Sequence, residues 1–352
     1  MPEIPGGARN TRAATMTDVA RTLGLSHQTV SRVLNGHPSV RPDTRARVLQ
    51  AIEALGYRRN TAARALVTRR SQTIGVVSFD TTLYGPASTL AGIEHAAQQA
   101  GYFVSVAIAK AVTTETVRDA LERLIAQSVE GVIVIAPLLG TVETLPALTR
   151  SLPVVIVESG HAPGLASVRV DQSVGARMAT RHLLERGAST VWHVAGPGDW
   201  IEAEARVAGW RAELTRAGAP VPDLLRGTWR PDSGYEAGRQ LARRTDVDAV
   251  FVANDQMALG LLRAFHEAGI RVPADVLVAG FDDVPEAAFY SPPLTTVRQD
   301  FGAVGRRSID LLLEQVVHRG TQTHQAVLPP ELVIRQSTLR RPRTSDVPEP
   351  RT

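Results

Sequence analysis

Residues 26–32 place polar side chains where a helix could present them to nucleic acid. Ser26 is a favoured residue before the first turn of a helix, so His27 and Gln28 are expected on that turn. Glutamine can pair with adenine through two hydrogen bonds and histidine can donate to guanine, so we predict that His27, Gln28 and Arg32 read base edges. The residues expected to contact phosphate oxygens are Thr15, Ser26, Thr29, Ser31, Asn35 and Thr44. The alternative is that all of these are exposed polar residues of a small helical bundle.

A second set of polar residues follows the apolar runs of the remaining chain. Asp80, Glu158, Asn254 and Asp282 stand where expected strands end, and Arg206 stands at the start of an expected helix. Because the carboxyl ends of parallel strands form the usual ligand site of α/β folds, these side chains are candidates for binding a polyhydroxylated ligand. Such a ligand also needs an aromatic face against its apolar side. The candidates for that face are Trp229 and Phe301.

Several of these residues also have a structural interpretation. Asn254 and Asp255 precede a helical stretch, where either would cap the helix N-terminus. Trp229 fits a core or surface aromatic residue, and Glu158 fits a structural ion pair. For each of these residues, the sequence leaves both the structural role and the ligand-binding role open.

The first set would be positioned by three short helices between residues 15 and 58. Gly24, Gly36 and Gly56 end these helices, and Pro42 opens the third. The apolar residues recur at helical spacing and would form one small core. They are Val19, Ala20, Leu23, Leu25, Val30, Val33, Leu34, Val48, Leu49, Ile52 and Leu55. This arrangement is typical of a helix-turn-helix fold, so we expect an all-α head.

The basic charge is concentrated in the same region. The whole chain has a formal net charge of +4, but residues 1–70 contain 12 arginines and 4 acidic residues, a net charge of +8. Residues 71–334 have 22 basic and 29 acidic residues, and residues 335–352 have 5 and 2. The division predicts a nucleic-acid-binding head on an acidic body, with DNA affinity that falls steeply with salt. Residues 1–14 and 341–352 lack periodicity and are expected to be disordered.

Residues 73–340 alternate short apolar runs with amphipathic helical stretches. The runs are rich in valine and isoleucine and apolar on both faces, as in parallel strands covered by helices on both sides. They span 73–79, 102–108, 131–136, 153–158, 191–195, 249–253 and 276–280. Because this length exceeds one comfortable core, we predict an α/β body of two doubly wound parallel-sheet subdomains.

Several classes of protein are excluded by composition and motif. The chain has no cysteine, so disulfide frameworks, thiolate zinc sites and cysteine nucleophiles are not expected. No apolar run is long enough for a membrane helix, and the first residues have no apolar signal segment, so we expect a cytoplasmic protein. A dinucleotide fingerprint, a P-loop and the common hydrolase and metalloprotease motifs are absent. We therefore expect no enzyme, no cofactor and no metal.

Motifs in both regions match a known family. The head has MTDVA at 16–20, GLS at 24–26 and TVSRVLN at 29–35, and the match continues through 46–57 and Asn60. The body has VANDQMALG at 252–260, PPLTT at 292–296 and QDF at 299–301. The chain thus resembles the LacI/GalR family of bacterial transcription regulators. The resemblance implies a helix-turn-helix domain at 15–58, a hinge at 59–72 and a periplasmic-binding-protein-like body at 73–340. One subdomain would comprise about residues 73–170 and 298–327, the other about 171–297 and 328–340.

The resemblance implies that the hinge becomes a helix on operator DNA and enters the minor groove. Leu66 would act there as an apolar wedge that helps to bend the duplex. The other residues implied at the minor groove are Asn60, Ala63 and Arg64. Arg59 departs from the family pattern, which often has proline at this position, so the hinge is expected to fold less readily.

The resemblance further implies a homodimer that represses carbohydrate-utilisation genes and associates with the nucleoid when bound to its operator. A sugar, either a galactoside or another glycoside, would bind between the subdomains and release the DNA. The residues that match effector-contacting positions are Leu83, Pro86, Glu158, Arg206, Trp229, Asn254, Asp282, Gln299, Phe301 and Val304. Two alternatives are a regulator that needs a non-sugar co-repressor, such as a purine, and a free sugar-binding protein.

Four departures from the family member that this chain most resembles bear on the ligand. Glu158 replaces an aspartate and Ile135 replaces an asparagine. Phe79 and Glu202 replace two serines near the mouth of the pocket. The added bulk and negative charge predict a different sugar or a different orientation of the glycoside.

Overall fold

The structure is a computed structural model of the chain. It describes residues 14–34, 36–57, 70–109, 113–135, 152–158, 164–318 and 324–339. The chain divides into two compact units, residues 1–71 and 72–352, which we call the head and the body. The expected arm and tail lie outside the described residues, except for Ala14. Most of the expected hinge also lies outside them.

The head is a bundle of three helices, α1 (Met16–Leu23), α2 (His27–Leu34) and α3 (Pro42–Ala54). Thr15 caps α1, and Gly24 ends it in the left-handed region with φ 63°. The core expected from helical spacing is present in part. Of the expected residues, Val19, Ala20, Val30, Val33 and Val48 are buried, and Leu49 and Leu55 are exposed. Ala51 and Tyr57, which were not expected, are also buried in this core. The tight Gly24 turn therefore lets α2 project from a small apolar core.

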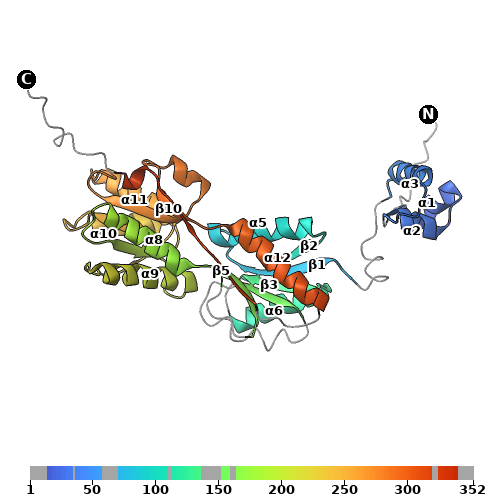
Figure 1. Cartoon of the computed structure of the whole chain (residues 1–352), viewed down its shortest axis with the longest axis horizontal. Helices are drawn as coiled ribbons and strands as arrows, with labels where there is room; N and C mark the ends of the chain where they lie inside the picture. The colour runs from blue at the N-terminus through green and yellow to red at the C-terminus, as the bar shows by residue number, and fades with distance from the viewer. Residues whose placement is uncertain are drawn as a thin grey trace, which may run out of the picture. The chain divides into compact units, whose positions relative to one another are not determined.

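The body contains two six-stranded sheets (Figure 1). The first has the order β11-β5-β4-β3-β1-β2, and all its described pairs are parallel. Its strands are β1 (Thr73–Phe79), β2 (Phe103–Ala109), β3 (Gly131–Ile135), β4 (Val154–Val157), β5 (Ala166–Val170) and β11 (Gln325–Leu328). We call this sheet and its helices the first lobe. The helices are α5 (Tyr84–Gln99), α6 (Thr114–Ala126) and α12 (Phe301–His318).

The second sheet has the order β12-β10-β9-β8-β6-β7. Its strands are β6 (Trp192–Ala195), β7 (Leu225–Arg226), β8 (Ala249–Val252), β9 (Leu277–Asp282), β10 (Thr295–Arg298) and β12 (Glu331–Val333). With α8 (Gln172–Glu185), α9 (Ile201–Ala217), α10 (Pro231–Leu241), α11 (Asp255–Glu267) and the short helices η2 (Pro285–Phe289) and η3 (Gln336–Thr338), it forms the second lobe. The predicted fold class, an all-α head with a body of two parallel sheets, is confirmed. One edge pair, β10 with β12, is antiparallel.

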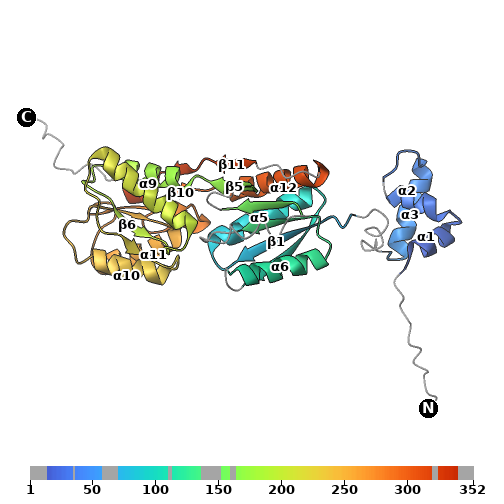
Figure 2. The same cartoon turned by 90° about the horizontal axis from the view of Figure 1, so that it is seen from below.

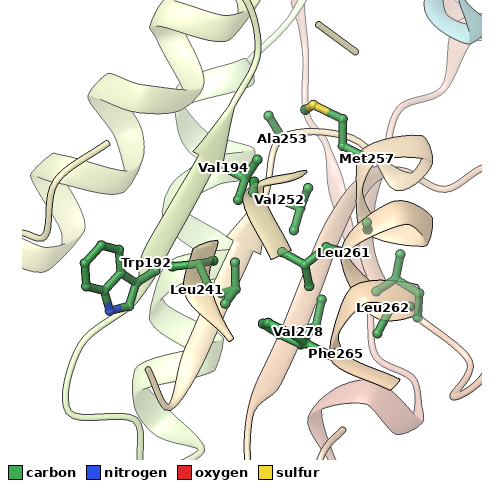
Figure 3. Packing of buried hydrophobic residues seen from close by; sticks show 14 of the residues in the cluster. Trp192, Val194, Leu241, Val252, Ala253, Met257, Leu261, Leu262, Phe265 and Val278 are labelled. Atoms are coloured by element: carbon green, nitrogen blue, oxygen red, sulfur yellow. The ribbon is translucent and has the colours of Figure 1, made fainter. Parts of the chain in front are cut away.

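Helices cover both faces of each sheet, which explains why the strands are apolar throughout. Figure 2 shows α12 and α6 on opposite sides of β1, and α9 and α10 on opposite sides of β6. Strands β3, β4, β6 and β8 are therefore buried at every residue. In the second lobe, Leu261 and Phe265 of α11 pack against Val252 and Val278 of the sheet (Figure 3). Among the described residues, we find no helix with the length and hydropathy needed to cross a bilayer.

The chain passes between the lobes at three places, after β5, after β10 and after β11. Residues 171, 299–300 and 329–330 lie at these crossovers. The carboxyl ends of the parallel strands β4, β8 and β9 lead to Glu158, Asn254 and Asp282. The fold thus brings the expected strand-end residues toward one region of the body.

Candidate DNA-binding face and effector cavity

The base-reading candidates lie on the exposed side of α2. His27, Gln28 and Arg32 are exposed, whereas Val30 and Val33 of the same helix are buried in the head core. Ser26 caps the helix, because its Oγ accepts a hydrogen bond from the Thr29 amide at 3.1 Å. A helix with a free polar N-terminal turn and a buried opposite side has the geometry needed to enter a major groove.

The phosphate candidates differ in how far their side chains are already engaged. Thr15 and Asp18 form a capping box, in which the Thr15 hydroxyl donates to Asp18 Oδ2 at 2.6 Å and accepts from the Asp18 amide at 3.3 Å. The hydroxyls of Ser26 and Thr29 lie 2.9 Å apart. Ser31 and Thr44 are half-buried. Asn35 and the hinge candidates Asn60, Ala63, Arg64 and Leu66 lie outside the described residues.

A cavity with about 480 Å³ of space not filled by atoms, part of it open to solvent, lies in the body. Nine of the ten expected effector residues line it: Leu83, Pro86, Glu158, Arg206, Trp229, Asn254, Asp282, Gln299 and Phe301. The tenth, Val304, is fully buried in the core of the first lobe. Asp80 is exposed and bonds to Thr82 instead of lining the cavity.

Both lobes contribute to the walls. The first lobe supplies mostly apolar side chains, among them Leu83, Pro86 and Phe301, while the second supplies Arg206 and Asp282. Sequence reasoning did not select six further lining residues as effector contacts: Tyr84, Gly85, Thr89, Ile135, Trp200 and Glu202. Ile135 and Glu202 were marked only as departures from the family. Trp200 directly precedes α9, so its position one residue before the helix of Arg206 was the available signal.

The polar residues of the cavity form a closed ring of interactions. Arg206 lies in the second turn of α9, and its Nε donates to Gln172 Oε1 at 2.9 Å. Gln172 Nε2 donates to Gln299 Oε1 at 2.7 Å, and Gln299 Nε2 donates to Asp282 Oδ1 at 2.7 Å. Asp282 closes the ring with an ion pair to Arg206, 3.6 Å between Nη2 and Oδ1. Gln172 and Gln299 follow two of the interlobe crossovers, so the ring joins the cavity to the connections between the lobes.

Burial controls the charge of this ring. Arg206 is 2% exposed and also donates to the Ala253 carbonyl, while its guanidinium lies 3.9 Å from the centre of the Phe281 ring. Burial raises the pKa of Asp282 to about 6, although Arg206 and the hydrogen bond from Gln299 oppose the rise. The arginine is thus fully engaged before any ligand binds, and its contacts fix the direction in which it faces the cavity.

The two interpretations of residues 254 and 255 are resolved by their contacts. Asn254 caps α11, since its Oδ1 accepts from the Met257 amide at 2.9 Å, and its Nδ2 donates to the Trp229 carbonyl at 3.0 Å. Asp255 is fully buried and accepts from the Val284 amide and the Thr296 hydroxyl. Burial raises its pKa well above the usual value, and the charge of Asp282 adds to the rise. Asp255 therefore holds the loop after β9 and does not line the cavity.

Trp229 is both a core residue and a cavity wall. It is 5% exposed, belongs to the second-lobe core, and adopts a left-handed backbone with φ 68°. A Cβ on Gly196 would lie 2.3 Å from its ring, so glycine is required there. The Arg206 guanidinium lies 5.4 Å from the ring centre, and Trp200 meets the ring edge-on at 5.4 Å. The indole is held rigidly against the polar ring.

Glu158 differs from Asp282 in its surroundings, because the ionisable side chain beside it is a second carboxyl, that of Glu202. Glu158 is 5% exposed, and both its carboxylate oxygens are buried with no basic group bonded to them among the described residues. Its backbone has φ 58°, and its amide donates to the Val168 carbonyl at 3.0 Å. Burial and the charge of Glu202 raise the pKa of Glu158. Among the described residues, no group of three or more His, Asp or Glu side chains has the arrangement of a metal site.

A head with an exposed polar helix face and a two-lobed body with a polar cavity are typical of a DNA-binding regulator with a ligand-sensing domain. Family comparison agrees with this class. Residues 15–60 match the model described as bacterial regulatory proteins, lacI family, and residues 180–338 match a periplasmic binding protein-like domain. The chain is 35% identical over 330 residues to the lactose operon repressor of Escherichia coli (strain K12), covering 93% of this chain and 91% of that protein. The chain belongs to the LacI family and is a transcriptional repressor of that family.

One further relative is a repressor with a different name, and two solved structures of similar proteins contain a bound small molecule. The repressor PurR of Pasteurella multocida (strain Pm70) is 33% identical over 92% of this chain and 98% of its own length. A solved complex of the regulator CelR with cellobiose is 31% identical, with a TM-score of 0.69, over 92% of this chain and 99% of that one. The lac repressor dimer bound to operator and the anti-inducer ONPF superposes with a TM-score of 0.85, over 94% of this chain and 100% of that one.

Proposed function

We propose that the chain is a dimeric, sugar-responsive repressor whose effector binds in the body cavity and releases operator DNA. The observation that supports this most directly is the convergence of Arg206, Asp282 and Gln299 with the aromatic side chains of Trp229 and Phe301 in one cavity. A sugar ring needs paired donors and acceptors on its edge and an aromatic surface against its apolar face. The similarity to the lactose operon repressor and to a CelR–cellobiose complex favours a saccharide.

The DNA-binding part of the proposal assigns base reading to His27, Gln28 and Arg32, and phosphate contacts to the hydroxyl residues around them. Two heads of a dimer would read two half-sites together, which gives affinity that a single head lacks. The hinge residues Asn60, Ala63, Arg64 and Leu66 would contact the minor groove between the half-sites. We propose that the protein acts in the cytoplasm, because its target is chromosomal DNA.

Release follows from linkage between the two sites. A ligand that binds one arrangement of the lobes more tightly shifts the body toward it, and the ring through Gln172 and Gln299 provides a physical route to the crossovers. Reciprocity then requires operator to weaken ligand binding by the same factor, with a typical coupling of ~1–3 kcal/mol.

A thermal-shift screen tests the proposal on the full-length protein. Mono- and disaccharides that bind the folded body should raise its melting temperature by mass action, and the same compounds should release operator DNA. A sugar that binds without changing operator affinity would contradict the regulatory role. Leu66→Ala should weaken specific operator binding and spare non-specific binding, and equal loss of both would contradict the wedge.

A second candidate is a repressor that responds to a planar non-sugar effector such as a purine. Trp229 and Phe301 supply flat surfaces on which a base would stack, and the similarity to repressors named PurR supports this alternative. Adding purine bases and nucleosides to the same screen distinguishes the two, because a purine would then tighten operator binding as a co-repressor.

A further inference from the structure

The cavity holds more acidic than basic side chains. Among its described lining residues, Glu158, Glu202 and Asp282 are acidic and Arg206 alone is basic. Arg206 is already committed to Asp282, to Gln172 and to the Ala253 carbonyl. The charge of Arg206 also acts on Glu158 and Glu202, but among the described residues its ion pair is with Asp282, so one guanidinium stands against three carboxyl groups.

Glu158 is the more unusual of these two glutamates. The residue is 5% exposed, and its two buried carboxyl oxygens lie beside Glu202 with no basic group bonded to them among the residues that the structure describes. Leaving a carboxylate buried and unpaired is unfavourable unless it takes up a proton or meets a cation. Burial and the neighbouring Glu202 carboxyl raise the pKa of Glu158, so a proton offsets part of this cost, and a cationic group in the cavity would take the place of that proton.

Glu202 is half-buried and brings a second carboxyl to the cavity from the other lobe. Glu158 follows β4 of the first lobe, whereas Glu202 lies in the first turn of α9 in the second. Burial raises the pKa of each carboxyl, and the charge of Glu202 raises the pKa of Glu158 further. The two groups therefore repel each other when both are ionised, and a positive charge between them would remove that repulsion.

The aromatic residues nearby suit a cation as well. Trp200, two residues before Glu202 in the sequence, also lines the cavity, and its ring meets Trp229 edge-on. Indole faces attract ammonium groups, and carboxylates form strong, charge-assisted hydrogen bonds with them.

We propose that the effector is an amino sugar whose protonated amine binds between Glu158 and Glu202. This inference rests on the proposed sugar-sensing function and narrows its ligand class. The sugar ring lies against Trp229 and Phe301 and bonds to the Arg206–Asp282 ring, while the amine joins the two lobes through one carboxylate from each. Neutral sugars leave the two glutamates unpaired and bind more weakly.

The test compares three matched sets of ligands on the full-length protein. Glucosamine, galactosamine and mannosamine are measured by calorimetry and thermal shift against their N-acetyl derivatives and their parent hexoses. The amine of at least one should give about 10- to 100-fold tighter binding than its two neutral counterparts, the usual range for a charged hydrogen-bonded pair. Glu158→Gln and Glu202→Gln should each abolish most of that preference.

Glu204→Gln is the matched control. Glu204 lies two residues beyond Glu202 on α9, pairs with Arg226 at 2.7 Å, and is not a lining residue. This variant should keep the preference for the amine. If either cavity variant fails to fold, the wild-type protein still decides the question. At about pH 6, where an amine is fully charged, its binding should release protons from the two carboxyl groups, and neutral sugars should release none.

The possible results separate this inference from the proposed function. A neutral sugar that binds as tightly as its amine and releases operator overturns the amine site and leaves the sugar-responsive repressor intact. A preference for amines that persists in both glutamine variants also overturns the site. An amino sugar that binds through both glutamates without affecting operator supports the site and contradicts the proposed regulation. Binding of purines with no response to any sugar contradicts both.

Discussion

The polar residues of the head and those of the body cavity differ in their exposure and in how far they are bonded to one another. His27, Gln28 and Arg32 are exposed and lie on a helix whose stability comes from Val30 and Val33 on the other side. Arg206 and Asp282 are buried and bonded to each other. The head can therefore change its specificity without changing its fold, whereas the cavity cannot change its polar ring without changing the stability of the body.

The strongest test of this contrast is Arg206→Ala. The substitution leaves Asp282 buried without its ion-pair partner, which typically costs ~3–5 kcal/mol. We expect a large fall in the free energy of unfolding of the body, together with loss of the response to effector, as measured by chemical denaturation and operator release. Arg263→Ala is the control, because Arg263 forms an exposed pair with Glu267 on one helix and should change little. A stable Arg206→Ala body that still responds to effector would contradict the contrast.

The next largest effect is a pH dependence confined to the body. Burial raises the folded-state pKa of Asp282 to about 6 from an ordinary value of 3.8. A raised acid pKa means that the folded state binds the proton more tightly, so its contribution is present below pH 3.8 and is lost as pH rises through about 6. The loss is at most roughly 3 kcal/mol. Asp282→Asn cannot titrate but still accepts from Gln299, so its melting temperature should fall less between these pH values than that of the wild type.

Sequence alone predicted what depends on local pattern. The spacing of apolar residues predicted β1 at residues 73–79 as observed, because a strand covered on both faces needs an unbroken apolar run. The N-cap and glycine signals located α2, because such residues favour the two ends of a helix. The expected run at 276–280 continues to Asp282, since the strand extends to the residue that turns into the cavity.

The contacts within the cavity could not be predicted in the same way. Gln172 was not a candidate, because its role depends on a crossover that brings it next to Arg206 and Gln299. Val304 was expected at the cavity wall, yet it faces the core of the first lobe, a choice that depends on the rotation of α12. Which of Asn254 and Asp255 caps the helix depended on a one-residue difference in where α11 begins.

The third test concerns base reading. Substitution of a proposed base-reading residue should change operator binding without changing the stability of the head. In the proposed base reading, Gln28→Ala would remove two hydrogen bonds to a base, worth ~1–3 kcal/mol, so specific affinity should fall about 10- to 100-fold. The melting temperature should stay unchanged, because Gln28 is exposed. Fluorescence anisotropy on an operator selected from random DNA measures the loss. Gln50, an exposed glutamine on α3, provides the matched alanine control. Equal loss on non-specific DNA would make Gln28 a phosphate contact.

The smallest expected effect separates two functions of one hydroxyl. Thr15 caps α1 through the capping box with Asp18, so Thr15→Ala should destabilise the head by ~1 kcal/mol and leave the body unaffected. Hydrogen exchange of the α1 amides measures this loss. Thr15→Ser keeps the hydroxyl and should restore both the cap and any phosphate contact. If Thr15→Ala lowers operator affinity by more than the destabilisation predicts, Thr15 also contacts DNA, and the head would then contain one polar residue that, like those of the cavity, serves fold and function together.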